Sequence, residues 1–179
     1  SLQLLAVLLA KGVLHFNDSG IARLGIAMAV GVGAGSLLAG YLSGTEIELG
    51  LVPLGGLGMG VFSVLMALTA RAHPHSVYLC IELLGAFGGL FIVPLNATLQ
   101  HRAGANAKGL VQAAANIFST LAMIAAALLI DFGSARLGLE ADTLVLLSGL
   151  LCFAVTIGLC VLLPEFPSAC ARWLRSRMH

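Results

Sequence analysis

The sequence predicts an all-α bundle of membrane-spanning helices. Of its 179 residues, 59% are hydrophobic and only 9% are charged, whereas soluble domains contain about 25% charged residues. Five apolar segments are each long enough to cross the hydrocarbon core, which takes roughly 20 residues of helix. Turn-forming and charged residues separate these segments, as in HFNDSG and DFGSARLGLEA. A chain so poor in charge cannot cover a water-facing surface, so lipid must be its solvent.

The five predicted spans follow one another at short intervals and cover residues 20–42, 47–70, 76–99, 109–130 and 142–163. Residues 1–14 form a shorter apolar run that contains Lys11, and we interpret it as part of a helix that begins upstream. Residues 164–179 contain two prolines and three arginines, which predict a basic tail at the membrane surface. The expected organisation is therefore a transmembrane unit over residues 1–163, followed by this tail. No charged region precedes the first apolar run, so we expect no signal peptide and interpret the chain as a fragment.

Charge and motif content argue against several classes of function. The formal net charge is +1, and Lys and Arg do not cluster outside the tail, so no nucleic-acid partner is expected. The four cysteines share no metal-binding or redox spacing. No set of nucleophile, base and acid recurs in one plausible site. We therefore expect no metal, no cofactor and no enzymatic activity in this segment.

Pairs of glycines four residues apart recur along three of the predicted spans. In lipid, helices associate through close backbone approach at small residues, because lipid tails solvate leucine as well as another helix does. We therefore expect these glycines to lie where helices pack. The stretches GVGAG, GYLSG and GAFGG supply Gly31, Gly35, Gly40, Gly44, Gly85 and Gly89, and GLGMG adds a further pair. Such pairs are common in proteins with several membrane spans and do not identify a function.

Polar side chains form a stripe on each of two consecutive spans. At 100° per residue, one stripe holds Glu82, Asn96 and Gln100 together with two glycines, and the next holds Lys108, Gln112, Asn116 and Ser119. The interiors of residues 47–70 and 142–163 contain no amide or ionisable group. A polar face within lipid must meet protein or a watery cavity. The two stripes therefore predict a cavity, with the two featureless spans toward the lipid.

Alternatives remain open for the single residues of these stripes. Each amide, taken alone, could instead form a hydrogen bond between helices that only supports the fold. Glu82 is the one acid well inside a span. Its carboxyl group is either protonated, paired or hydrated within a cavity, or it extends toward the membrane surface.

Several stretches resemble the lysophospholipid transporters of the major facilitator superfamily. They are GSLLAGYLSG, IELGLVPLG, VPLNATLQ and AKGLVQAAANIF. The resemblance implies the second half of a twelve-helix transporter, from late in helix seven through helix twelve, with the N-terminal half as its missing partner. It also implies that helices nine and twelve lie on the outside of the bundle. The two featureless spans, residues 47–70 and 142–163, correspond to these two helices.

The resemblance further implies the import of lysophospholipid across a bacterial inner membrane to the cytoplasmic leaflet, where it is reacylated. The substrate path would then contain Glu82, Asn96, Gln100, Lys108, Gln112, Asn116 and Ser119. Five Lys and Arg residues on the side of the tail, against four on the other, place the tail in the cytoplasm. Some relatives are fused to a 2-acylglycerophosphoethanolamine acyltransferase, and the tail is similar to such a junction. The alternatives are a transporter half for another amphiphile or a drug, and a structural membrane module of a fused acyltransferase.

Overall fold

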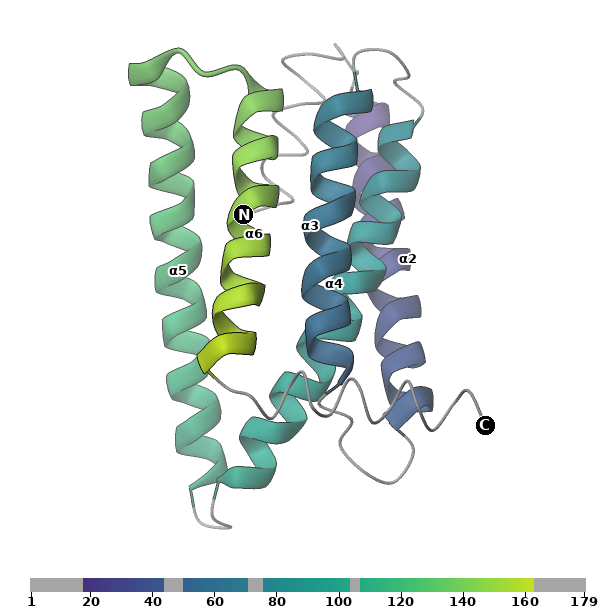
Figure 1. Cartoon of the computed structure of the whole chain (residues 1–179), viewed down its shortest axis with the longest axis vertical. Helices are drawn as coiled ribbons and strands as arrows, with labels where there is room; N and C mark the ends of the chain where they lie inside the picture. Colours follow the sequence, from purple (N-terminus) through teal and green to yellow (C-terminus); the bar gives the residue numbers. More distant parts are fainter. Residues whose placement is uncertain (1–17, 44–49, 71–75, 104–106, 163–179) are drawn as a thin grey trace.

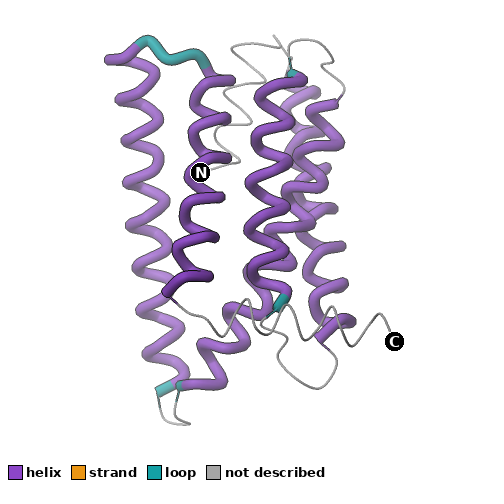
Figure 2. The backbone as a smooth tube through the Cα atoms, in the orientation of Figure 1, coloured by secondary structure: helices purple, strands orange, loops and turns teal. Residues whose placement is uncertain are grey.

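The computed structural model describes residues 18–43, 50–70, 76–103 and 107–162, and these ranges hold five α-helices and no strand (Figures 1 and 2). The helices are α2 (Asp18–Ser43), α3 (Leu51–Thr69), α4 (Ser76–Arg102), α5 (Lys108–Leu137) and α6 (Ala141–Leu162). Each is long and apolar enough to cross a membrane. The predicted all-α bundle of membrane-length helices is confirmed. The apolar run 1–14, the tail 164–179 and Gly44 lie outside the described residues.

Two helices continue past their predicted ends. α4 reaches Arg102 rather than residue 99, and α5 reaches Leu137 rather than residue 130. The prediction of a turn at DFGSAR was wrong, because one glycine and one serine only weaken a helix and do not end it. α5 ends at Gly138, whose positive φ of 61° is the conformation that closes many helices. The N–H of Leu139 then donates to the carbonyl of Gly133 at 3.1 Å.

Consecutive helices run in opposite directions, so their ends gather at two levels (Figure 1). The ends of α2, α4 and α6 and the starts of α3 and α5 share the lower level in that view. α4 packs against both α2 and α3, and α6 packs against the other side of α3. The largest buried cluster includes side chains from all four of these helices, among them Leu24, Met66, Val77, Ile81 and Val145.

Glycines bring the backbones of α2 and α4 into direct contact. A Cβ atom built on Gly31 or Gly35 would overlap the backbone carbonyl of Glu82 or Ala86 on α4. From the other side, a Cβ on Gly85 would lie 2.6 Å from the carbonyl oxygen of Met28. A Cβ on Gly89 would similarly lie 2.6 Å from the amide nitrogen of Ser36. The two Gly-x-x-x-Gly pairs therefore face each other, and no other residue fits this crossing.

Gly40 does not belong to this contact. It is exposed, and nothing lies within 4 Å of a Cβ built on it, so its predicted packing role was wrong for the described helices. The reason is its angular position. Gly40 follows Gly35 by five residues, which turns it about 140° away from the face that meets α4.

α3 uses a different glycine face for each neighbour. Gly55 approaches Phe91 of α4, where a Cβ would lie 2.7 Å from the backbone nitrogen. Gly56 lies against Thr156 of α6, and the buried Ser63 hydroxyl donates to the carbonyl of Val145 on α6 at 3.1 Å. α3 is consequently the most buried of the five described helices, although it presents an exposed apolar face of Leu57, Val61, Leu65 and Leu68.

Candidate functional site

A buried proline bends α4 toward α5. Pro94 lies inside the helix and is fully buried. Its ring carries no N–H, so the carbonyl one turn earlier loses its usual partner and the helix kinks. In Figure 1 the lower, C-terminal part of α4 turns toward the lower end of α5. The hydroxyl of Thr98 donates to the Pro94 carbonyl at 2.7 Å within the bent segment.

A chain of amide side chains joins the bent segment of α4 to α5. Nε2 of Gln100 donates to Oε1 of Gln112 at 3.3 Å, and Nε2 of Gln112 donates to Oδ1 of Asn116 at 3.3 Å. One turn further along α5, the hydroxyl of Thr120 donates to the backbone carbonyl of Asn116 at 2.9 Å. The chain is exposed rather than buried in the described bundle. The two polar stripes therefore meet at their lower ends, at Gln100 and Gln112.

The other residues predicted for the site lie at varying distances from this amide chain. Asn96 is half-buried and lies one turn before Gln100, whereas Ser119 is exposed and lies one turn after Asn116. Lys108 is exposed at the first residue of α5. Glu82 is half-buried and precedes Asn96 by fourteen residues, or about 21 Å along a helix. The structure thus places Glu82 near the opposite level of the bundle, apart from the amides.

The amide chain offers both hydrogen-bond donors and acceptors, beside cationic side chains. A primary amide supplies two N–H donors and one oxygen acceptor, so it can bind a phosphate oxygen as well as a hydroxyl group. His101 and Arg102 lie in the last turn of α4, and Lys108 begins α5. The lower end of this helix pair therefore combines neutral hydrogen-bonding groups with positive charge.

The middle of α5 is exposed on every side. All ten residues from 116 to 125 are exposed, and they include the large apolar side chains of Ile117, Phe118 and Leu121. α5 is the least buried of the five described helices. The polar stripe of α5 is therefore not covered by the other described helices, and the cavity around it stays a prediction. Asn116 and Ser119 stand on an open surface instead.

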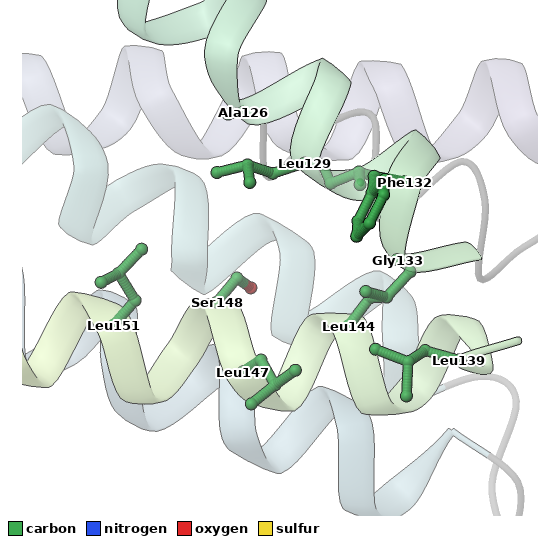
Figure 3. Close-up of a pocket in the computed structure, with 10 residues that line it drawn as sticks. Ala126, Leu129, Phe132, Gly133, Leu139, Leu144, Leu147, Ser148 and Leu151 are labelled. Atoms are coloured by element: carbon green, nitrogen blue, oxygen red, sulfur yellow. The ribbon is translucent and has the colours of Figure 1, made fainter. Parts of the chain in front are cut away.

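A second feature, which the sequence analysis did not predict, is an apolar groove between α5 and α6 (Figure 3). Its volume is about 300 Å³. Apolar residues in an apolar span carry no pattern that marks a groove. The small residues Ala126 and Gly133, two turns apart on one face of α5, are the signal that could have indicated it. The groove is lined by Ala126, Leu129, Ile130, Phe132, Gly133, Leu139, Leu144, Leu147, Ser148 and Leu151.

Two curated relatives named as lysophospholipid transporters are similar to the chain. The protein from Cronobacter sakazakii is 37% identical over 103 residues, which are 57% of this chain and 25% of the relative. The protein from Pectobacterium carotovorum subsp. carotovorum is 38% identical over 107 residues, 59% of this chain and 26% of the relative. The chain thus spans about a quarter of the length of these relatives.

No protein-family model matches the chain, and no solved structure matches it significantly. The five membrane-length helices and the two relatives together indicate a multi-pass membrane protein. The resemblance to lysophospholipid transporters that the sequence motifs predict is confirmed over more than half of the chain.

Proposed function

We propose that this chain is the C-terminal half of a major facilitator transporter that moves lysophospholipid toward the cytoplasmic leaflet of a bacterial inner membrane. The observation that carries the proposal is the similarity to two proteins named as lysophospholipid transporters. Because the chain spans about a quarter of those relatives, the activity is assigned to the complete transporter. The chain itself contributes membrane-length helices to that transporter.

The chemistry of the amide chain supports this substrate. A lysophospholipid carries a phosphate, a free glycerol hydroxyl and one acyl chain. Gln100, Gln112 and Asn116 can donate to the phosphate and exchange hydrogen bonds with the hydroxyl. Lys108 at the start of α5 adds attraction for the negative charge. Asn96 and Ser119 extend the polar surface by one turn on each side. We assign Glu82 a separate place in the path, closer to the other membrane surface.

The exposed stretch of α5 supports the N-terminal half as the partner. Asn116 and Ser119 would contact hydrocarbon if α5 faced only lipid, and polar groups are costly there. A second helical unit against residues 116–125 would remove this contact and would enclose the amide chain from the other side. The path then lies between the two halves, which is why the described helices alone leave it open.

Two other functions are compatible with the helices. A transporter half for another amphiphile would use the same amides, and a structural module of a fused 2-acylglycerophosphoethanolamine acyltransferase would need only the glycine contacts. The full-length protein, purified and reconstituted in vesicles, separates the three. We expect it to move labelled lysophospholipid between leaflets faster than protein-free vesicles, in the absence of any acyl donor. Transport of drugs but not of lysophospholipid would support the first alternative, and no transport of either would support the second.

The proposed orientation can be tested at the two ends of α5. If the tail is cytoplasmic, Ala103 lies on the cytoplasmic side and Gly138 on the opposite side, because α5 alone separates them. Alkaline phosphatase fused after Gly138 should therefore be active, and the same enzyme fused after Ala103 should be inactive. A green fluorescent protein at each point should give the reverse. Activity of the phosphatase at Ala103 would invert the orientation.

A further inference from the structure

We propose that the α5–α6 groove, the apolar groove described above, holds the acyl chain of the transported lysophospholipid. The inference rests on the proposed function and assigns a subsite to it. Its floor is formed by Ile130 and Leu144, which are 8% and 9% exposed and belong to the main buried cluster. Its walls are the exposed side chains of Leu129 and Phe132 on α5 and of Leu147 and Leu151 on α6.

The chemistry of the lining suits hydrocarbon rather than a headgroup. Of the ten lining residues, Ser148 alone has a polar side chain. Its hydroxyl already donates to the carbonyl of Val145 at 2.7 Å and lies 3.4 Å from the hydroxyl of Ser63. In Figure 3 the ring of Phe132 points from α5 toward α6, and Leu151 points from α6 toward α5. A phosphate placed here would lose its hydration without gaining a partner.

The size of the groove suits a small ligand. The groove offers about 300 Å³, at the lower limit of the range for small-molecule sites. One acyl chain is a ligand of this class.

The position of the groove relative to the amides fits one amphiphilic molecule. Asn116 and Ala126 lie on the same helix, ten residues or about 15 Å apart. The exposed residues between them include Ile117, Phe118 and Leu121. A molecule whose headgroup lies at the amide chain would therefore meet apolar side chains along α5 and reach the groove with its tail. This order of polar and apolar partners matches a lipid with one acyl chain.

Two alanines allow a matched test in the full-length transporter. Ala126 on α5 lines the groove, whereas Ala154 on α6 is exposed and does not line it. Ala126→Phe should fill part of the groove, and Ala154→Phe should add the same side chain outside it. We expect Ala126→Phe to lower the transport of a sixteen-carbon lysophospholipid relative to an eight-carbon one by at least about fourfold, the factor for one buried methylene. Ala154→Phe should leave this ratio unchanged.

A crosslinking measurement on the unmodified transporter supplies an independent result. A lysophospholipid with a photoreactive group at the end of its acyl chain should label peptides that contain residues 126–133 or 144–151. An unchanged chain-length ratio in Ala126→Phe, or labelling spread evenly over the exposed helix faces, would show that bulk lipid fills the groove. A transporter that moves no lysophospholipid of either length would refute the proposed function. The crosslinking pattern would then decide alone whether the groove binds an acyl chain.

Discussion

Gly35→Leu is expected to remove most of the folded protein from the membrane. A Cβ atom at this position would overlap the backbone carbonyl of Ala86, so α2 and α4 would have to separate along their whole crossing. Overpacking costs about 1–3 kcal/mol when side chains can move aside. Here the obstacle is a backbone carbonyl, which cannot move aside, so we expect the loss of stability to reach or exceed the upper end of that range. The separation would also disturb the reciprocal contacts of Gly85 and Gly89. The folded fraction can be measured by size-exclusion chromatography in mild detergent and by the midpoint of unfolding in a denaturing detergent.

Two glycines on the same helix serve as controls for this prediction. Gly33 and Gly40 have no atom within 4 Å of a Cβ built on them, and both are exposed. Gly33→Leu and Gly40→Leu should therefore leave the unfolding midpoint close to that of the unmodified protein, since leucine is well tolerated in a helix that faces lipid. Equal stability of Gly35→Leu and Gly33→Leu would mean that α2 and α4 do not cross at these glycines.

The glycine pattern predicted only some of the close contacts between helices. The spacing of four residues indicates a flat helix face, but it does not tell which faces meet. Gly31 and Gly35 meet α4, while the similar pair that begins at Gly40 has its first member on an exposed face. The number of spans followed from hydrophobicity alone because it depends on length. The rotation of each span depends on its neighbours, which the spacing of glycines does not identify.

For the candidate site as well, features within one helix could be predicted from the sequence, whereas features that depend on neighbouring helices could not. The amide stripes on α4 and α5 follow from helical periodicity, and the kink that joins them follows from Pro94. Their exposure does not follow, because a sequence stripe indicates a polar face without naming what covers it. The α5–α6 groove was missed for a related reason. Leu129 on α5 and Leu147 and Leu151 on α6 do not differ from the other leucines of these apolar spans. They line a groove only because the two helices lie a certain distance apart, and the sequence does not give that distance.

Gln112→Leu is expected to lower lysophospholipid transport by about tenfold, which corresponds to about 1.4 kcal/mol, without reducing the amount of folded transporter. Gln112 is the middle residue of the amide chain, and it both accepts from Gln100 and donates to Asn116. Leucine has a similar size but can do neither. A hydrogen bond between membrane helices stabilises the fold by only about 0.6 kcal/mol on average, so the fold should persist. The lost contact with the headgroup should appear in transport, measured per folded molecule in vesicles.

Thr120→Val is the matched control for Gln112→Leu, because it also removes a hydrogen bond near Asn116 on α5. The lost bond joins the Thr120 hydroxyl to a backbone carbonyl of the same helix, so it does not connect α5 to α4. Transport should stay within about twofold of the unmodified protein, because such a bond within one helix adds little. If Gln112→Leu instead lowers the folded amount while each remaining molecule transports normally, the amide chain only joins α4 to α5. The access of water to position 112 is a second way to distinguish an amide that lines the substrate path from one that only joins α4 to α5. In a transporter with its native cysteines replaced, Gln112→Cys should react with a water-soluble thiol reagent, and lysophospholipid should slow this reaction if the amides line its path.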